Sequence, residues 1–259
     1  MNYNRKHTGT ANMDTKVHMS DQIKSAEKYY NRLIADKEYL KTITLDCKSD
    51  DFQVKGGTIW DGKYLYNLYQ EGSLPWEWHK ELFDYAAEQG ITLFSSPFDE
   101  TAVDLLQELN APAYKIASFE LIDLPLIKRA AECGKPLLMS TGMASVIEVA
   151  EALDVAIKYG CGDVLLFHCI SSYPAPITDS NLKNIEFLRK EFGVEVGLSD
   201  HTTDSIAAIS SIALGACMVE KHFTLDNSAG GPDDFFSMEP DDLMTVSYTH
   251  LTLPTILLV

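Results

Sequence analysis

Six apolar segments between residues 91 and 223 are continuous enough to predict buried parallel strands. An amphipathic helical pattern follows each of the first five, for example at residues 100–110, 124–134, 145–160 and 182–193. Buried strands that alternate with helices predict βα units, and therefore an α/β fold around a parallel sheet. The six segments are ITLFSS (91–96), AYKIAS (113–118), PLLMST (136–141), DVLLFHC (163–169), VEVGLSD (194–200) and ACMVEKHF (216–223).

Polar residues gather at the carboxyl end of these segments. In a doubly wound sheet, the site lies at the one point where the strand order reverses. Here all six segments carry polar residues at the same end. That distribution is typical of a (β/α)8 TIM barrel, which builds its site from all its βα loops. About six βα units are recognisable, so we expect an incomplete barrel. The polar residues are Ser95, Ser96, Lys115, Ser118, Glu120, Ser140, Thr141, His168, Ser199, Asp200, His201, Lys221 and His222.

The two ends of the chain break this pattern. Residues 1–40 are polar, and the segment from Ser20 predicts one amphipathic helix, followed by a short strand at 42–47 and a helix beginning near Pro75. Residues 246–259 are β-prone around Pro254 and predict a disordered tail or a stretch of foreign sequence. We therefore confine the barrel domain to residues 41–245.

The composition is that of a globular protein with a strongly acidic balance. Hydrophobic residues make up 46% and charged residues 23% of the chain, which excludes wholesale disorder. The net charge of −17 argues against general nucleic-acid binding and against an anionic membrane surface, because both need a cationic face. The sequence shows no apolar signal segment, no run approaching the roughly 20 apolar residues of a membrane span, and no CxxC pair among its five cysteines. We expect a cytoplasmic protein in a reducing compartment.

Two histidines at the ends of consecutive predicted strands, His201 and His222, suggest a metal site. Two imidazoles suit a borderline divalent cation such as Mn²⁺, Zn²⁺ or Fe²⁺. The alternative is a pair of histidines whose ring nitrogens are satisfied by hydrogen bonds to the loops. The spacing alone leaves both interpretations open.

Two lysines inside predicted strands, Lys115 and Lys221, suggest an anion site, because lysine is rarely buried without a partner. Lys115 together with the hydroxyls of Ser96, Ser118, Ser140 and Ser199 could hold a phosphate or carboxylate. The alternative is a salt bridge, for instance between Lys115 and Glu120.

Three further features carry possible chemistry. Glu120 could be a general acid or base, or simply a charge at a helix entry. The glycine-rich loop after the last strand could carry Asp233 over the mouth of the barrel. Aromatic residues between 60 and 78 favour packing over a sugar platform.

These features together resemble the sialic acid synthase family, closest to its pseudaminic acid synthase branch. Family members condense phosphoenolpyruvate with an amino-sugar aldehyde to give a nonulosonic acid. The resemblance implies a 2,4-diacetamido-2,4,6-trideoxy hexose as the sugar, with N-acetylneuraminate or legionaminate synthesis as alternatives, and a homodimer for full-length relatives. The motifs are YKIASFE (114–120), LLMSTGM (137–143), HCISSYP (168–174), VGLSDHT (196–202), VEKHFTLD (219–226) and GGPDDFFSMEPDDL (230–243).

The resemblance also implies roles for matched positions. His201 and His222 match the ligands of a divalent metal, usually Mn²⁺, with Mg²⁺ or Co²⁺ as alternatives. Glu120 matches a catalytic acid or base, and Lys115 matches a lysine that holds phosphoenolpyruvate at the reacting centre. The positions that match substrate-binding residues are Ser96, Ser118, Ser140, Ser171 and Ser199 for phosphoenolpyruvate, and Tyr173 and Asp233 for the sugar.

The chain departs from the family pattern at both ends. Residues 1–40 lack the glutamate and the KxQ motif of the first two barrel strands, and the C-terminal antifreeze-like domain is absent. The resemblance therefore implies a truncated barrel. The competing hypotheses are an inactive fragment of such an enzyme, a related metal-dependent lyase or aldolase, and a carbohydrate-binding module built on exposed rings between 60 and 78.

Overall fold

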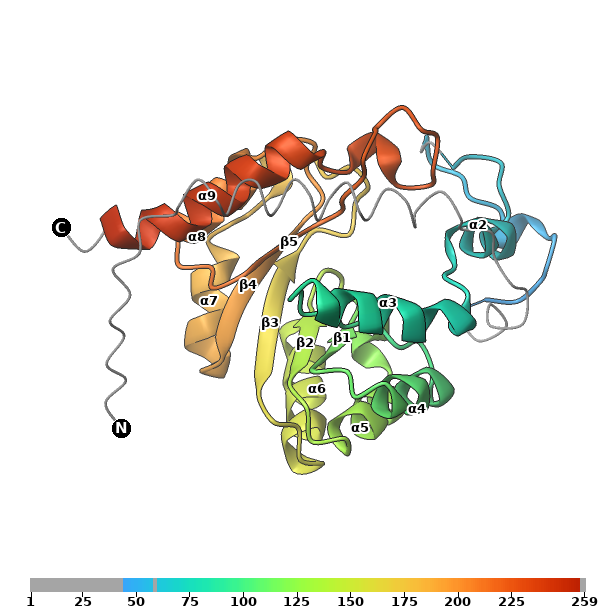
Figure 1. Cartoon of the computed structure of the whole chain (residues 1–259), viewed down its shortest axis with the longest axis horizontal. Helices are drawn as coiled ribbons and strands as arrows, with labels where there is room; N and C mark the ends of the chain where they lie inside the picture. The colour runs from blue at the N-terminus through green and yellow to red at the C-terminus, as the bar shows by residue number, and fades with distance from the viewer. Residues whose placement is uncertain (1–43, 58–59, 257–259) are drawn as a thin grey trace. The chain divides into compact units, whose positions relative to one another are not determined.

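The described part of the chain is built around one curled sheet of five parallel strands. The computed structural model describes residues 44–57 and 60–256 (Figure 1). Neighbouring strands in the sheet follow the order of the sequence, β1-β2-β3-β4-β5, and each pair is parallel. The strands are β1 (Tyr114–Ile116), β2 (Leu137–Ser140), β3 (Val164–Cys169), β4 (Glu195–Asp200) and β5 (Val219–Lys221). The fold is an α/β, incomplete (β/α)8 barrel, as the sequence predicts.

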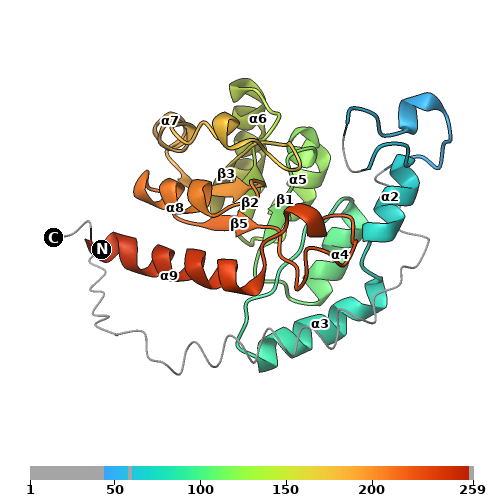
Figure 2. The same cartoon turned by 90° about the horizontal axis from the view of Figure 1, so that it is seen from above.

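Helices connect the strands and cover the outer face of the sheet (Figure 2). The predicted helix at 145–160 is α6, which begins after a capping box in which Ser145 Oγ accepts from the Glu148 N–H and Glu148 accepts from the Ser145 N–H. Within the described residues, no helix combines the length and apolarity that a bilayer crossing needs. The helices are α2 (Leu65–Gly72), α3 (Trp76–Glu88), α4 (Glu100–Glu108), α5 (Leu124–Ala131), α6 (Val146–Lys158), α7 (Asn184–Phe192), α8 (Ile206–Ala213) and α9 (Pro240–Ile256).

The main core lies between the sheet and its helices. Side chains alternate along a strand, so Tyr114 and Ile116 point outward into this core while Lys115 between them points to the inner face. The inner face carries a smaller apolar cluster of Ala113, Leu138 and Phe167. Gly197 is required there, because a Cβ at this position would lie 2.8 Å from the Phe167 ring.

The predicted strand at 91–96 is wrong. Only Ser95 bridges to β1, opposite Tyr114, with its carbonyl accepting from the Lys115 N–H at 3.1 Å. Ile91 is 47% exposed, so the start of this segment is not a buried strand. The predicted strand at 42–47 is also not observed over its described residues 44–47, where Leu45 is 66% exposed. The helix predicted from Ser20 lies outside the described residues.

The alternative of a disordered tail from residue 246 is not observed over the described residues, which run to Ile256. Residues Pro240–Ile256 form one helix, α9, which packs along α8. Val246 is buried and belongs to a cluster with Ala208 and Met238. Apolar packing of Val246 and Leu243 in this cluster supports the first turns of α9. The foreign origin of residues 246–259 stays a prediction.

Candidate functional site

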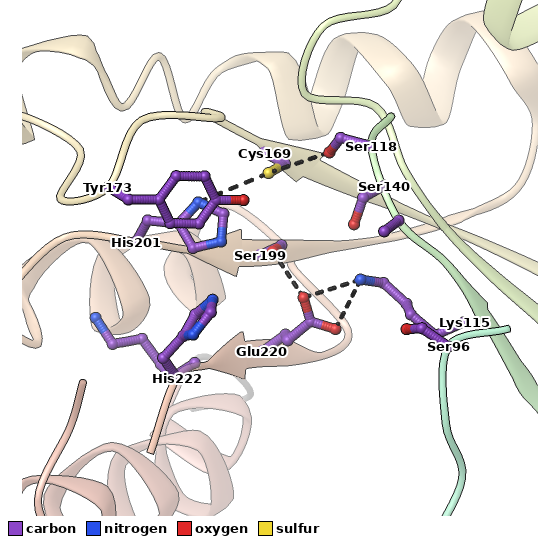
Figure 3. Close-up of a pocket in the computed structure, with 12 residues that line it drawn as sticks. Ser96, Lys115, Ser118, Ser140, Cys169, Tyr173, Ser199, His201, Glu220 and His222 are labelled. Atoms are coloured by element: carbon purple, nitrogen blue, oxygen red, sulfur yellow. Dashed lines mark hydrogen bonds and ion pairs between the residues drawn. The ribbon is translucent and has the colours of Figure 1, made fainter. Parts of the chain in front are cut away.

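A cavity of about 370 Å³ opens at the carboxyl ends of the strands (Figure 3). Each of the five strands, or the loop directly after it, contributes to the wall. Nine of the candidate residues from the sequence line this cavity together. The lining residues are Ser96, Lys115, Ala117, Ser118, Ser140, Cys169, Tyr173, Ser199, His201, Glu220, Lys221 and His222.

Strand alternation explains why these side chains converge. Cys169 lies opposite Ser199, and Ser199 lies opposite Glu220, so the three belong to one inward-facing row. His201 and His222 each follow two residues later along the chain and continue the same row beyond the strand ends. The parallel register therefore brings residues between Cys169 and His222 into one wall.

The floor of the cavity holds an ion pair between Lys115 and Glu220. Lys115 Nζ lies 3.0 Å from both carboxylate oxygens of Glu220, and Ser199 Oγ donates to Glu220 Oε1 at 2.7 Å. Lys115 also lies over the Phe167 ring, 5.3 Å from its centroid. The salt bridge that the sequence suggested for Lys115 exists, but its partner is Glu220 and not Glu120.

The serines of the cavity differ in how their hydroxyls are used. Ser118 Oγ donates to Cys169 Sγ at 3.6 Å and accepts from the Gly142 N–H at 3.2 Å. A Cβ at residue 142 would lie 2.8 Å from Ser118 Oγ and closer still to Ser171 Oγ, so only glycine fits here. Ser140 Oγ is buried and finds no hydrogen-bond partner among the described residues. A buried hydroxyl without a partner is costly, so Ser140 is poised to bind a ligand.

The two histidines lie next to each other, with ring centroids 5.2 Å apart. His201 Nδ1 lies 2.8 Å from the Ile170 carbonyl oxygen, and His222 Nδ1 lies 3.1 Å from Asp233 Oδ2. Since a carbonyl and a carboxylate only accept, both Nδ1 atoms carry a proton and both Nε2 atoms are left for a ligand. Histidines that ligate metals are commonly held in this way.

This donor set fits a divalent cation with open coordination positions. Within residues 44–57 and 60–256, no group of three or more His, Cys, Asp or Glu side chains is arranged to hold a metal ion. His201 and His222 would therefore supply two ligands, and substrate or water would supply the rest.

Aromatic rings cover the histidine side of the cavity. The Tyr173 ring lies 4.2 Å from the His201 ring between centroids and 5.6 Å from the Phe236 ring. Trp60 packs on Tyr173 and donates from Nε1 to the Pro232 carbonyl oxygen at 2.8 Å. The loop that carries Asp233 is thereby tied to the residues before α2. Asp233 reaches the site through His222 and is not among the lining residues.

The remaining aromatic residues between 60 and 78 do not form an exposed platform. Tyr64, Tyr66, Trp76 and Trp78 are half-buried, and Tyr69 is 38% exposed. The prediction that favoured packing over a sugar platform is consistent with this burial, which disfavours a carbohydrate-binding module.

Burial and hydrogen bonding shift the proton affinities of the inward row. Burial by itself raises the pKa of Cys169, but hydrogen bonds with His201, Ser118 and Ser199 outweigh it and leave the pKa lowered. Burial lowers the pKa of His201, and the interactions with Cys169 and Ile170 outweigh this effect and leave it raised. Burial raises the pKa of Tyr173, so its hydroxyl stays protonated.

Glu120 and Ser171 lie beside the cavity and are not among the described residues that line it. Glu120 begins a short 3₁₀ helix after β1, and its buried Oε2 has no hydrogen-bond partner within the described part of the chain. Burial raises the pKa of Glu120, and the nearby charge of Lys115 only partly offsets this. The Ser171 hydroxyl is likewise buried and has no partner among the described residues.

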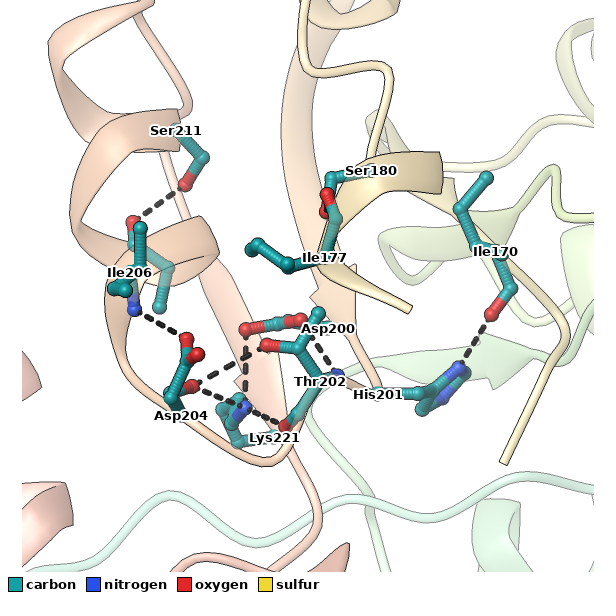
Figure 4. Close-up of polar contacts among 11 residues, drawn as sticks. Ile170, Ile177, Ser180, Asp200, His201, Thr202, Asp204, Ile206, Ser211 and Lys221 are labelled. Carbon is teal, nitrogen blue, oxygen red and sulfur yellow. Dashed lines mark hydrogen bonds and ion pairs between the residues drawn. The ribbon is translucent and has the colours of Figure 1, made fainter. Parts of the chain in front are cut away.

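Lys221 is not available to bind an anion, although it borders the cavity (Figure 4). Its Nζ donates to Asp200 Oδ2 at 3.0 Å and to the carbonyl oxygens of Thr202 at 2.6 Å and Asp204 at 3.1 Å. Three acceptors use all three ammonium protons. The interpretation of Lys221 as an anion-binding candidate is therefore wrong, and the residue instead secures the loop that follows His201.

The prediction from sequence missed Glu220 and Cys169 as lining residues. Residues two positions apart in a strand face the same side. Glu220 lies two positions before the predicted residue His222, and Cys169 lies two before the predicted residue Ser171. Counting back by two from each candidate would have found them.

The sequence matches the NeuB family over residues 35–252. The chain belongs to the NeuB family. The match begins before and ends after the predicted limits of 41 and 245.

Two NeuB relatives show how far the similarity extends. The chain is 46% identical over 197 residues to pseudaminic acid synthase from Helicobacter pylori, covering 76% of this chain and 58% of that protein. It is 40% identical over 203 residues to N,N'-diacetyllegionaminic acid synthase from Campylobacter jejuni, covering 78% of this chain and 60% of that protein. The chain therefore spans about 58% to 60% of the length of these relatives.

The solved structure of an N-acetylneuraminic acid (sialic acid) synthetase from Leptospira borgpetersenii in complex with citrate has the same fold. It superposes with a TM-score of 0.71 at 30% identity and covers 74% of this chain and 67% of that chain. The likeness supports the barrel architecture of the described residues.

Proposed function

We propose that this chain carries the barrel site of a phosphoenolpyruvate-dependent nonulosonic acid synthase. The observation that carries the proposal is the single cavity that joins a lysine and several serine hydroxyls to a pair of histidines with free Nε2 atoms. The side of the cavity with the lysine and the hydroxyls suits a phosphate or carboxylate. The side with the two histidines suits a cation that activates a carbonyl group. Names of the relatives support the same reaction class, since they are pseudaminic, legionaminic and N-acetylneuraminic acid synthases.

Phosphoenolpyruvate is the anion assigned to the lysine side of the cavity. Lys115 offers a fixed positive charge, and the unpaired Ser140 hydroxyl offers a donor that no described protein group uses. Ser96 and Ser118 complete the wall on this side. These residues would orient the enol carbon, carbon 3, toward the histidine side.

The sugar aldehyde is assigned to the histidine side, beneath Tyr173 and beside Asp233. A divalent cation held by His201 and His222, with Mn²⁺ favoured over Mg²⁺ or Co²⁺, would supply Lewis-acid polarisation of the aldehyde oxygen when bound. Tyr173, kept protonated by burial, can donate a hydrogen bond to a sugar oxygen.

The reaction forms one C–C bond and releases phosphate. Carbon 3 of phosphoenolpyruvate attacks the aldehyde carbon, water adds at carbon 2, and phosphate leaves with cleavage of its bond to carbon 2. Glu120, whose pKa is raised by burial, is the carboxyl proposed to exchange protons with the substrates. The proposed sugar is a 2,4-diacetamido-2,4,6-trideoxy hexose, because the pseudaminic acid synthase of H. pylori is a 46% identical relative. The 40% identical legionaminic acid synthase supports the alternative sugar isomer.

A phosphate-release assay tests this function. The chain is incubated with phosphoenolpyruvate, Mn²⁺ and the diacetamido-trideoxy hexose, with N-acetylmannosamine as the competing sugar and the His201→Ala/His222→Ala double variant as the blank. Sugar-dependent release that the double variant lacks is the expected result, and the preferred sugar names the branch. Absence of release from folded chain would favour the alternative of an inactive fragment.

The proposed enzyme class also suggests a compartment, partners and an assembly state. We infer a cytoplasmic enzyme that acts on small molecules, without a nucleic-acid or membrane partner, and a homodimer as the assembled form of full-length relatives. Size-exclusion chromatography with light scattering of the chain measures its assembly state.

A further inference from the structure

Glu220 stands apart from the other lining residues because it brings a negative charge into a cavity proposed to bind anions. Its side chain is 35% exposed and lies in the inward row, between Ser199 on β4 and Lys115 on β1 (Figure 3). No role has been assigned to it above. Its contacts involve two residues assigned to the binding of phosphoenolpyruvate.

The Lys115–Glu220 pair joins the first and last strands of the sheet. Four inter-strand spacings of about 4.8 Å would separate β1 from β5 by roughly 19 Å in a flat sheet. The contact at 3.0 Å therefore crosses the interior of the curled sheet instead of following it. Glu220 fixes the Lys115 ammonium at the centre of the cavity floor.

Counting donors shows what Glu220 leaves for a ligand. Ser199 has one hydroxyl proton, and it points to Glu220 Oε1. Lys115 has three protons, of which the carboxylate engages up to two. The remaining Lys115 proton and the Ser140 hydroxyl are available to an anion. The Glu220 carboxylate also repels any anion that lies on Lys115, at a range where charge repulsion is strong.

We propose that Glu220 is a positioning residue that holds Lys115 and Ser199 in place and whose charge weakens the binding of phosphate, so that the product leaves the cavity. The proposal rests on the proposed function, because it presumes that an anion occupies this floor. Phosphate ion is then bound by geometry, through directed donors, and only weakly by net charge, since Lys115 and Glu220 cancel each other.

A purely structural salt bridge makes the opposite prediction. If Glu220 only braced Lys115, its removal would loosen the lysine and weaken phosphate binding. If its charge opposes the ligand, removal of that charge strengthens phosphate binding even though one hydrogen-bond acceptor is weakened.

Calorimetric titration of the full chain with inorganic phosphate, and separately with phosphoenolpyruvate, distinguishes these cases. Glu220→Gln keeps the shape and removes the charge, and we expect it to bind phosphate about tenfold more tightly than the wild type. In turnover with phosphoenolpyruvate and sugar, KM for phosphoenolpyruvate should fall together with kcat, because product release becomes slower. Glu195→Gln, at the exposed start of β4, is the matched control and should change the phosphate Kd by less than about twofold.

The outcomes separate the two proposals. Phosphate affinity that is unchanged or reduced in Glu220→Gln, with binding by the wild type intact, would overturn the role of Glu220 alone. If neither the wild type nor Glu220→Gln binds phosphate or phosphoenolpyruvate, the proposed function is overturned and this inference with it. If Glu220→Gln does not fold, Glu220→Ala is titrated instead with the same expected sign, and failure of both variants to fold would make Glu220 a structural residue.

Discussion

Two lysine–carboxylate pairs lie on opposite faces of the sheet and serve different purposes. Lys221 and Asp200 point outward, with side chains only 5% and 2% exposed, and all ammonium protons have protein acceptors. Lys115 and Glu220 point inward, with side chains 10% and 35% exposed, and border a cavity. A buried lysine is thus structural when the protein itself uses every proton, and is available for function when protons remain.

Removal of the outward lysine should have the largest effect of all. Lys221→Met leaves Asp200 as an unpaired buried charge, which costs about 3–5 kcal/mol of unfolding free energy. Chemical denaturation followed by circular dichroism measures this loss. Lys190→Met, which breaks an exposed pair with Glu186 on α7, is the control and should cost less than about 1 kcal/mol. Equal losses in the two variants would remove the distinction between the pairs.

Removal of the inward lysine should be less costly for folding and more costly for binding. Lys115→Met leaves Glu220 unpaired but partly hydrated, so we expect a loss of about 1–3 kcal/mol in unfolding free energy. The same variant should lose measurable phosphate binding, because the fixed positive charge of the cavity floor is gone. Denaturation and phosphate titration of one preparation give both numbers. A variant that binds phosphate normally would contradict the assignment of Lys115.

Two buried serines extend the comparison to uncharged groups. Ser211 Oγ donates to the Ala208 carbonyl oxygen at 2.7 Å, so Ser211→Ala should cost about 1 kcal/mol of unfolding free energy. Ser140 Oγ has no partner within the described residues, so Ser140→Ala should be neutral within about 0.5 kcal/mol but should weaken phosphate binding several-fold. Thermal melts together with phosphate titration check both. A matching loss of stability at Ser140 would mean that its hydroxyl already has a structural use.

The smallest expected effect is a pH dependence at Glu120. Burial raises the pKa of this carboxyl in the folded chain above its ordinary value of 4.5, so the folded state binds the proton more tightly than the unfolded state. Its contribution to stability is therefore present at low pH and is lost as pH rises through the raised pKa. Glu120→Gln should gain stability relative to the wild type as pH rises from about 4 to about 7.

Denaturation curves across this pH range measure the Glu120 effect. Glu151→Gln, on the exposed side of α6, is the control for loss of one charge from an acidic chain. A constant difference between Glu120→Gln and wild type at every pH would contradict a raised pKa.

Periodicity predicted the parts of the fold that depend on local pattern. The segments that became β1 to β5 are mainly apolar with polar residues toward their carboxyl ends, and the helices between them have clear amphipathic spacing and capping residues such as Ser145. The pattern at 91–96 has the same composition, but only Ser95 meets a neighbouring strand. Strand formation there depends on a partner edge, which the local sequence does not encode.

The site was predictable as a set of residues and not as a set of contacts. Parity along the strands places Lys115, Ser199 and both histidines at one mouth. The partner of Lys115 depends on how tightly the sheet curls, and this brings Glu220 closer than Glu120, although Glu120 is only five residues away. Lys221 looked equivalent to Lys115 in sequence, and only the path of the loop after β4 shows that its protons are used.

The agreement between strand order and chain order has a consequence for synthesis. A ribosome delivers β1 to β5 in the order in which they pair, so each new strand finds its neighbour already made, and the sheet can grow unit by unit from short-range steps. The contact between Lys115 and Glu220 spans 105 residues and forms only after β5 has emerged. The nascent chain therefore builds most of the sheet before it completes the floor of its cavity, and affinity for an anion arises only after β5 has been made.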